Sequence, residues 1–186
     1  MKRTISILAT VALLLLLGSW LRSEASNSNA IKDKAQRTAQ QEARQQRRAE
    51  RLAAYEKFID SLVLSHNFRF IPQTMQQLPG GMMRTLQNPC YEIWVDNREV
   101  DVCIPFLKGY TPPYYPVVFN YVLPTVDNYI AEQTDNGWHI SFQSSLFSAT
   151  DYTFSFEINS HYGGAILTIS TPIYNSVQYS GNILAI

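Results

Sequence analysis

The sequence contains few charged residues, and those that it has are unevenly distributed. Charged residues make up only 16% of the 186 residues, whereas about 25% is usual for a soluble domain. All 15 lysines and arginines lie at or before Lys108, so the chain beyond that point carries acidic residues and no basic one. Because contacts to phosphate groups need lysine or arginine, this distribution argues against nucleic-acid binding by the C-terminal half.

Patterns typical of catalytic and metal sites are also absent from the sequence. The three histidines, His66, His139 and His161, stand at no metal-binding spacing from another histidine, a cysteine or a carboxylate. The chain has no Gly-x-Ser-x-Gly nucleophile elbow and no glycine-rich phosphate loop. We therefore expect no catalytic residues, no metal, no cofactor, and a function other than catalysis.

Cysteine is scarce, because the sequence has only Cys90 and Cys103. A chain without a cysteine near its N-terminus cannot be lipidated there in the manner of bacterial lipoproteins. The two cysteines flank a predicted hairpin turn at Asn97-Arg98, which places Glu92 opposite Cys103 and Cys90 one diagonal away on the same face. That diagonal is near the geometric limit for a disulfide, which would stabilise the fold by roughly 3 kcal/mol. A disulfide and two buried free thiols are both open interpretations.

The one long apolar run lies at the N-terminus. Met1-Lys2-Arg3 is basic, Ile5 to Leu17 is apolar, and Ser23-Glu24-Ala25 offers the small residues of a cleavage site. This pattern is typical of a secretory signal peptide over residues 1–25. The alternative is an uncleaved membrane anchor over residues 5–21, which is at the short limit for a membrane span. Both interpretations predict export across the inner membrane to the periplasm or cell exterior, an oxidising environment for the cysteines.

A polar linker over residues 26–39 is predicted to precede a single domain over residues 40–186. Gln40 to Leu64 is rich in good helix formers and is predicted to be a helix. Its apolar stripe consists of Leu52, Tyr55, Ile59 and Leu62. Its basic residues stand among acidic ones, so we prefer an ordinary solvated face to a membrane-binding one.

Beyond Asn67 the pattern changes to short alternating runs that are rich in tyrosine and phenylalanine. Turn signals such as Asp135-Asn136-Gly137 separate these runs. The predicted fold class is α+β and β-rich, with an N-terminal helix followed by an antiparallel meander, either an open sheet or one curled towards a barrel or sandwich. Strands are expected near residues 68–71, 91–95, 100–104, 117–122, 126–132, 138–143, 152–158, 165–169 and 176–183, with a loop over 77–88.

Three segments resemble a known family in their order and spacing. They are Phe58–Val63 with Ser65, Phe68 and Phe70, then Pro105–Tyr110 with Pro113-Tyr114, and finally Tyr179–Ile183. Together they resemble the family called domain of unknown function 4251, exported proteins of Bacteroides-type Gram-negative bacteria, over roughly Arg51 to Ile186. The resemblance implies export and a β-rich domain, and it implies no activity. Many members look like lipoproteins, a property that does not transfer to this chain.

A segment rich in proline and tyrosine is the strongest binding signal in the sequence. Prolines stiffen a loop, and tyrosine offers a flat apolar face with a polar tip, which suits binding to a glycan, a peptide or an envelope protein. The alternative is that these rings pack the loop onto the sheet. The predicted function is a non-catalytic periplasmic or cell-surface binding domain, and the alternative is a structural or protein-interaction component of the envelope. The candidate ligand-binding residues are Tyr110, Tyr114, Tyr115 and Tyr121.

Overall fold

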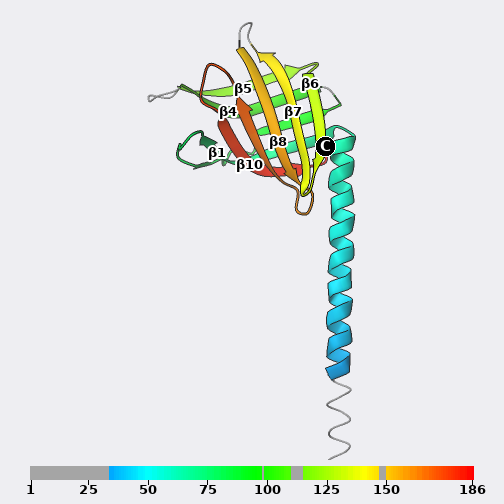
Figure 1. The fold of residues 1–186 in the computed structure, drawn as a ribbon. Coiled ribbons are helices and arrows are strands. Elements are labelled where there is room, and N and C mark those ends of the chain that lie inside the picture. Colours follow the sequence, from blue (N-terminus) through cyan, green and yellow to red (C-terminus); the bar gives the residue numbers. More distant parts are fainter. Residues whose placement is uncertain (1–33, 98, 110–114, 147–149) are drawn as a thin grey trace, which may run out of the picture. The chain divides into compact units, whose positions relative to one another are not determined.

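The structure is a computed structural model that describes residues 34–186 except 98, 110–114 and 147–149. The chain divides after Arg51 into two compact units, Met1–Arg51 and Leu52–Ile186, and each unit is described by itself. Residues 34–64 are helical and cross this division, and the strands all belong to the second unit. Figure 1 shows the helix and the strands.

The helix confirms the sequence prediction and begins earlier than predicted. Residues 34–39, placed at the end of the linker by the sequence, are already helical. This segment contains alanine, lysine, glutamine and arginine and no proline or glycine, so its helical propensity continues that of the next turns. The helix ends at residue 64, and His66 follows with a positive φ of 53°. Among the described residues, no helix is both long and apolar enough to cross a membrane.

The described strands match the predicted runs, and most extend further. The sequence missed β2, which has only two residues and lies in the predicted 77–88 loop. The strands are β1 (Asn67–Gln77), β2 (Arg84–Thr85), β3 (Glu92–Asp96), β4 (Glu99–Lys108), β5 (Tyr115–Leu123), β6 (Asp127–Thr134), β7 (Gly137–Leu146), β8 (Thr150–Asn159), β9 (Gly164–Ser170) and β10 (Val177–Leu184).

All the described strands belong to one antiparallel sheet with the order β5-β4-β3-β1-β10-β9-β8-β7-β6, and β2 pairs with β1 beside this path. The first strand therefore pairs with the last, and two meanders meet at the β1–β10 ladder. The consecutive strands β5 and β6 form opposite edges of the sheet. The sheet curls into an open half-barrel in which β4 and β5 pass behind β7 and β8 (Figure 1). This confirms the predicted antiparallel sheet and its curling.

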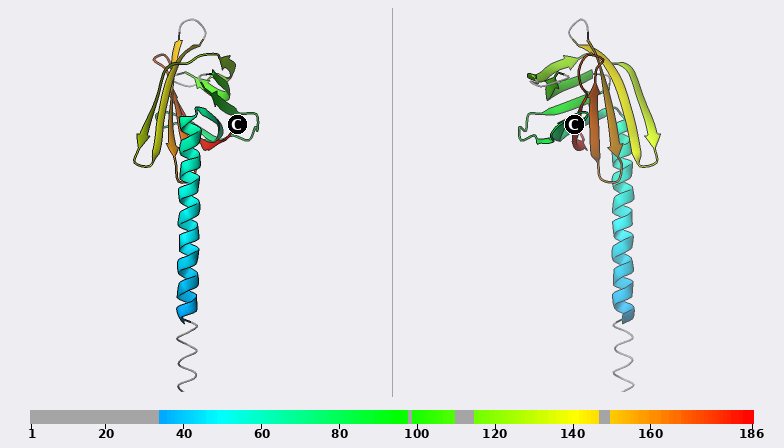
Figure 2. Two further views of the ribbon diagram at one scale, coloured as in Figure 1. Left: turned by 90° about the vertical axis from the view of Figure 1, so that its right-hand side faces the viewer. Right: turned by 60° about the vertical axis from the view of Figure 1, so that its left-hand side comes forward.

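Curling brings one side of each meander to face the other (Figure 2), and these facing sides carry the buried apolar residues. The ring centroid of Phe156 on β8 lies 6.0 Å from that of Phe68 and 5.5 Å from that of Phe70, both on β1. Phe106 on β4 lies 5.9 Å from Tyr152 on β8, although these strands are far apart in the sheet order. Edge-to-face pairs of this kind add to the free energy gained by burying each ring. The core is therefore formed by one face of the sheet folded over itself.

The last turns of the helix, from Leu52 onward, complete this core. Ile59, Leu62 and Val63 are buried there, whereas Leu52 is 51% exposed and Tyr55 37% exposed. The predicted apolar stripe is thus half buried. Asp60 accepts hydrogen bonds from Trp138 Nε1 at 2.8 Å and Ser160 Oγ at 3.0 Å. These two bonds fix the helix end to β7 and to the turn after β8.

Candidate binding groove on the outer face of the sheet

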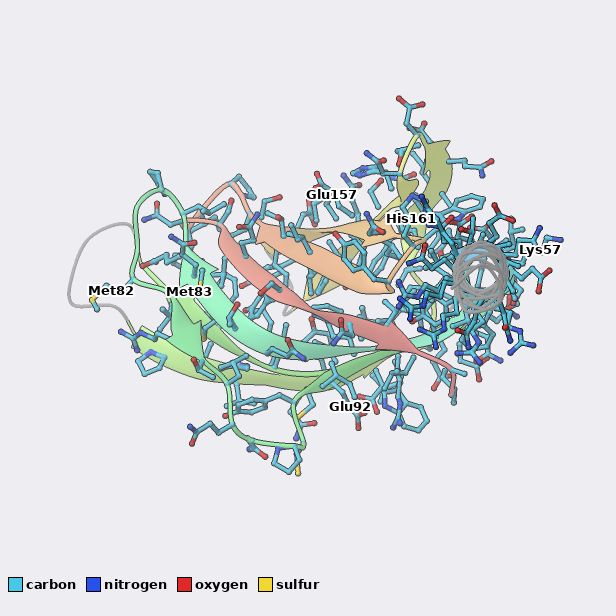
Figure 3. The ribbon with its side chains drawn as sticks, turned by 90° about the horizontal axis from the view of Figure 1, so that it is seen from below. Lys57, Met82, Met83, Glu92, Glu157 and His161 are labelled. Atoms are coloured by element: carbon cyan, nitrogen blue, oxygen red, sulfur yellow. The ribbon has the colours of Figure 1, made fainter. Side chains whose placement is uncertain are left out.

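The outer face of the C-terminal meander carries polar side chains at regular positions. On β8, Phe154 and Phe156 point to the core, so the alternating Ser155 and Glu157 face outward. In Figure 3, Glu157 projects from the outer side of the sheet, while Glu92 lies on the opposite side of the molecule. Because neighbouring strands are in register, such residues form rows across the sheet.

One row crosses five strands. Cross-strand pairs connect Glu132 on β6 to His139 on β7, and His139 to Glu157 on β8. Glu157 is paired with Ile166 on β9, which is paired with Ser180 on β10. Directly opposite side chains in a ladder lie about 5 Å apart at their Cβ atoms. The row therefore places two carboxylates, an imidazole, an apolar side chain and a hydroxyl side by side.

A groove of about 700 Å³ lies over this row. Tyr162, in the turn between β8 and β9, is 68% exposed and forms part of its wall. Its ring lies over Gly164, where an added Cβ would come within 2.6 Å of Tyr162 Cε2. Ile166 supplies an apolar patch within the groove and is 38% exposed. The groove thus combines an exposed aromatic ring, an apolar patch and polar groups.

The far side of the groove is formed by a bulge in β1. Pro72 pairs with Gly181 and Thr74 with Ser180, so Gln73 is an extra residue that has no partner on β10. An added Cβ on Gly181 would lie 2.1 Å from the Ile71 carbonyl oxygen, so only glycine permits this close approach. The bulge leaves Gln73 exposed and lining the groove.

Several polar groups of the groove are available to a ligand. Within the described part of the chain, the side chains of Glu132, His139 and Glu157 have no hydrogen bond or ion pair, nor do those of Gln73 and Asn182. Ser180 Oγ, by contrast, is bonded to Thr74 Oγ1 at 2.5 Å. None of the residues that line the groove is a lysine or arginine. The groove is therefore acidic and can both donate and accept hydrogen bonds.

The carboxylates and the imidazole of the groove belong to residue types that commonly bind metal ions. Among the described residues, no group of three or more histidines, cysteines, aspartates or glutamates is arranged to hold a metal ion. The side chains that line the groove can form hydrogen bonds, carry negative charge and present an aromatic surface.

The structure describes the predicted tyrosine site only in part. Tyr110 and Tyr114 lie outside the described residues, as does the side chain of Tyr115, whose backbone begins β5. Tyr121 is partly buried, and its ring packs edge-on against Phe119 at 5.9 Å. Burial first, and then Tyr152, raise the pKa of Tyr121 well above its usual range. Tyr121 therefore belongs to the margin of the core, and the loop tyrosines remain a prediction.

The predicted cysteine hairpin is confirmed in its register. Glu92 pairs with Cys103, and Asp96 pairs with Glu99 around the two-residue turn. Both thiols are free in the structure, with Cys90 exposed and Cys103 half-buried. Burial, followed by Cys90 and the carboxylates of Asp101 and Glu92, raises the pKa of the Cys103 thiol. The disulfide remains a prediction.

The sequence analysis missed the groove although it identified the strands. His139 and Glu157 appear in the sequence as the polar half of alternating runs, which describes any solvated strand face. The tight Asp135-Asn136-Gly137 turn sets the register of β6 and β7 and so places Glu132 opposite His139. The pairing of His139 with Glu157 depends on the register of β7 and β8, which that turn does not set. Pro72 within β1 and Gly181 within β10 are the sequence signals that could have indicated the bulge, because proline and glycine inside strands often mark such irregularities.

The fold and the groove define a small domain of one curled antiparallel sheet with a polar recess on its outer face. A family model described as a domain of unknown function, DUF4251, matches residues 50–183. The chain therefore belongs to the DUF4251 family, which confirms the resemblance in its sequence. None of the curated proteins matches the chain.

A solved structure shows a similar fold. A crystal structure of a DUF4251 family protein from Bacteroides eggerthii DSM 20697 has a TM-score of 0.56 and 15% sequence identity to this chain. The similarity covers 72% of this chain and 89% of that chain. At this identity the likeness supports the fold and says nothing about a ligand.

Proposed function

We propose that this protein is an exported, non-catalytic binding domain of the cell envelope that holds a small polar ligand in the outer-face groove. The observation that carries the proposal is the row of Glu132, His139 and Glu157, whose side chains have no partner among the described residues and line one recess with Tyr162. Export rests on the N-terminal sequence pattern, and binding rests on the groove.

The size and construction of the groove support binding. Its volume of about 700 Å³ lies within the range of about 300–1,000 Å³ typical of small-molecule sites. The residues of the row stand on paired strands, so their backbones lose little conformational entropy when they meet a ligand. This differs from the site predicted in the Pro/Tyr loop, and the two sites make different mutational predictions.

The test is thermal unfolding of the full-length protein, purified as it accumulates, against glycans, peptidoglycan fragments, lipids and metal ions. A ligand at about 100 times its dissociation constant adds nearly 3 kcal/mol, which shifts the midpoint by several degrees. Ile166→Arg introduces a bulky charge into the groove and is expected to abolish the shift. The matched control is Val122→Arg, at an outward-facing β5 position that is 53% exposed.

The outcomes separate the two candidate sites. A shift that survives in Val122→Arg and is lost in Ile166→Arg supports the groove. A shift that survives Ile166→Arg but is lost when Tyr114 and Tyr115 become alanine in a folded protein assigns binding to the Pro/Tyr loop. No shift across the panel would count against the binding domain and favour a protein partner.

A specific feature favours the alternative, a protein-interaction component of the envelope. At about 100° per residue, the basic residues in the described part of the first unit fall within about 140° of the helix circumference, and Glu42 and Glu50 lie on the other side. All are exposed. Such a face suits an acidic partner, which crosslinking in the intact envelope would capture. The basic residues are Lys34, Arg37, Arg44, Arg47, Arg48 and Arg51.

A further inference from the structure

The charge of the groove narrows the chemistry of its ligand. Glu132 and Glu157 stand one strand apart from His139, on either side of it. With strands spaced about 4.8 Å apart, their backbones are about 10 Å from each other. One small cationic group can therefore lie near either carboxylate without having to bridge both.

Within the described part of the chain, no lysine or arginine side chain lines the groove to offset these carboxylates. Every residue after Lys108 that carries a formal charge at neutral pH is acidic. An anionic ligand would approach two uncompensated negative charges, whereas a cationic ligand would be attracted by them and by the field of this half of the chain. The charge of the groove thus favours a cationic ligand over an anionic one.

The aromatic wall adds a second attraction for a cation. Tyr162 is exposed, and its ring lies over Gly164 at the edge of the recess. An ammonium group within about 6 Å of such a ring is attracted to its negative face. The side-chain amides of Gln73 and Asn182, which have no hydrogen-bond partner among the described residues, can bond the neutral part of the same molecule.

We infer that the groove binds a ligand carrying a primary ammonium group, which lies near Glu157 and against the Tyr162 ring, while Glu132 adds to the negative field of the groove. This inference rests on the proposed function and specifies the chemical class of its ligand. A neutral ligand, such as an uncharged sugar, is the competing occupant.

The test uses three probes that share one ring and differ in charge: glucosamine, glucose and glucuronate. Dissociation constants are measured by two-dimensional NMR titration of the full-length protein at low salt. We expect glucosamine to bind about tenfold more tightly than glucose, because an exposed ion pair and a cation–π contact each contribute modestly. Glucuronate is expected to bind more weakly than glucose. Added salt should reduce the preference for glucosamine.

Variants show whether the carboxylates are responsible. Glu157→Gln and Glu132→Gln together should remove most of the preference for glucosamine, so that its dissociation constant approaches that of glucose. Tyr162→Leu keeps an apolar surface and removes the ring, so it should weaken glucosamine more than glucose. The matched control is Glu92→Gln on the opposite side of the molecule (Figure 3), which should change neither constant.

Equal binding of glucose and glucosamine, or a preference that the double glutamine variant retains, would overturn the inference. The inference would also be overturned if a neutral or anionic compound bound in the groove and glucosamine did not. Loss of that binding in Ile166→Arg would show that the compound occupies the groove. In each of these cases the proposed binding function stands. If nothing in the panel binds and no sugar probe shifts a groove resonance, the proposed function and this inference fail together.

Discussion

Along strand β8, Phe154 and Phe156 are fully buried, whereas the intervening Ser155 and Glu157 face outward. The inner residues join an apolar cluster that extends from β1 across to β5 and β7. The outer residues meet polar neighbours and a groove. One strand therefore serves stability on one face and leaves the other free for recognition, because side chains alternate between the faces. The following predictions test how complete this division is.

The largest expected effect is on the inner face. Phe156→Ala removes a fully buried ring that contacts Phe68, Phe70 and Phe142. We expect a loss of about 3–5 kcal/mol in the free energy of unfolding, measured by urea denaturation. The matched control is the adjacent Ser155→Ala, for which a change within about 0.5 kcal/mol is expected. Similar losses in both variants would contradict the division between the faces.

A disulfide between Cys90 and Cys103 would let residues outside the apolar core contribute to the free energy of unfolding. Oxidation of Cys90 and Cys103 to a disulfide would close a short loop and add roughly 3 kcal/mol. Because the pKa of the Cys103 thiol is raised, less thiolate is present near pH 7, and we expect oxidation to be faster at higher pH. Thiol counting and urea denaturation of oxidised and reduced protein measure both effects. The Cys90→Ser variant should show no gain on oxidation.

A smaller effect is expected where the helix end meets the sheet. Asp60→Ala leaves the indole N–H of Trp138, a buried residue, and the Ser160 hydroxyl without their acceptor. The expected loss is about 1–3 kcal/mol, accompanied by a change in tryptophan fluorescence. Asp60→Asn keeps an acceptor oxygen and should lose less. If Asp60→Ala were as stable as the parent, these bonds would not hold the helix end in solution.

The sequence predicted those features of the fold that depend on local chemistry. Alternation identified the strands because each has one buried face, as in Trp138, Ile140 and Phe142 on β7. The Asn97-Arg98 turn predicted the register of β3 and β4, because a two-residue turn determines which residues face each other. These predictions needed only residues that are close in sequence.

What the sequence could not predict depends on distant partners. The β1–β10 ladder joins segments more than a hundred residues apart, such as Thr74 and Ser180. The sequence suggested a simple meander, in which the first and last strands need not meet. The groove lies across this ladder and its bulge, so its far wall was not predictable. The loop tyrosines were predicted as the binding site because their segment, rich in proline and tyrosine, has the most unusual local composition in the sequence.

The smallest expected effect tests the boundary between the faces, at edge strand β6. The ring of Tyr129 stacks on Phe142 at 6.1 Å, and its buried hydroxyl has no hydrogen-bond partner among the described residues. Burial raises the pKa of Tyr129 to about 12. Tyr129→Phe keeps the ring and removes the unsatisfied hydroxyl, so near pH 7 the free energy of unfolding should stay equal or rise by less than about 1 kcal/mol.

Removal of the Tyr129 hydroxyl is also expected to change how the free energy of unfolding depends on pH. An unfolded tyrosine ionises near pH 10, whereas folded Tyr129 stays protonated to about pH 12. The folded state therefore holds more protons between these values, and stability falls as the pH rises from about 10 to 12. Urea denaturation over this range should show that the free energy of unfolding falls less steeply with pH in Tyr129→Phe than in the parent protein. The decrease that remains in the variant is due to groups such as Tyr121 and Tyr179, whose pKa values are also raised. An unchanged slope, or a loss above about 1 kcal/mol near pH 7, would mean that water or another group satisfies the hydroxyl, so that the apolar interior does not extend to this edge.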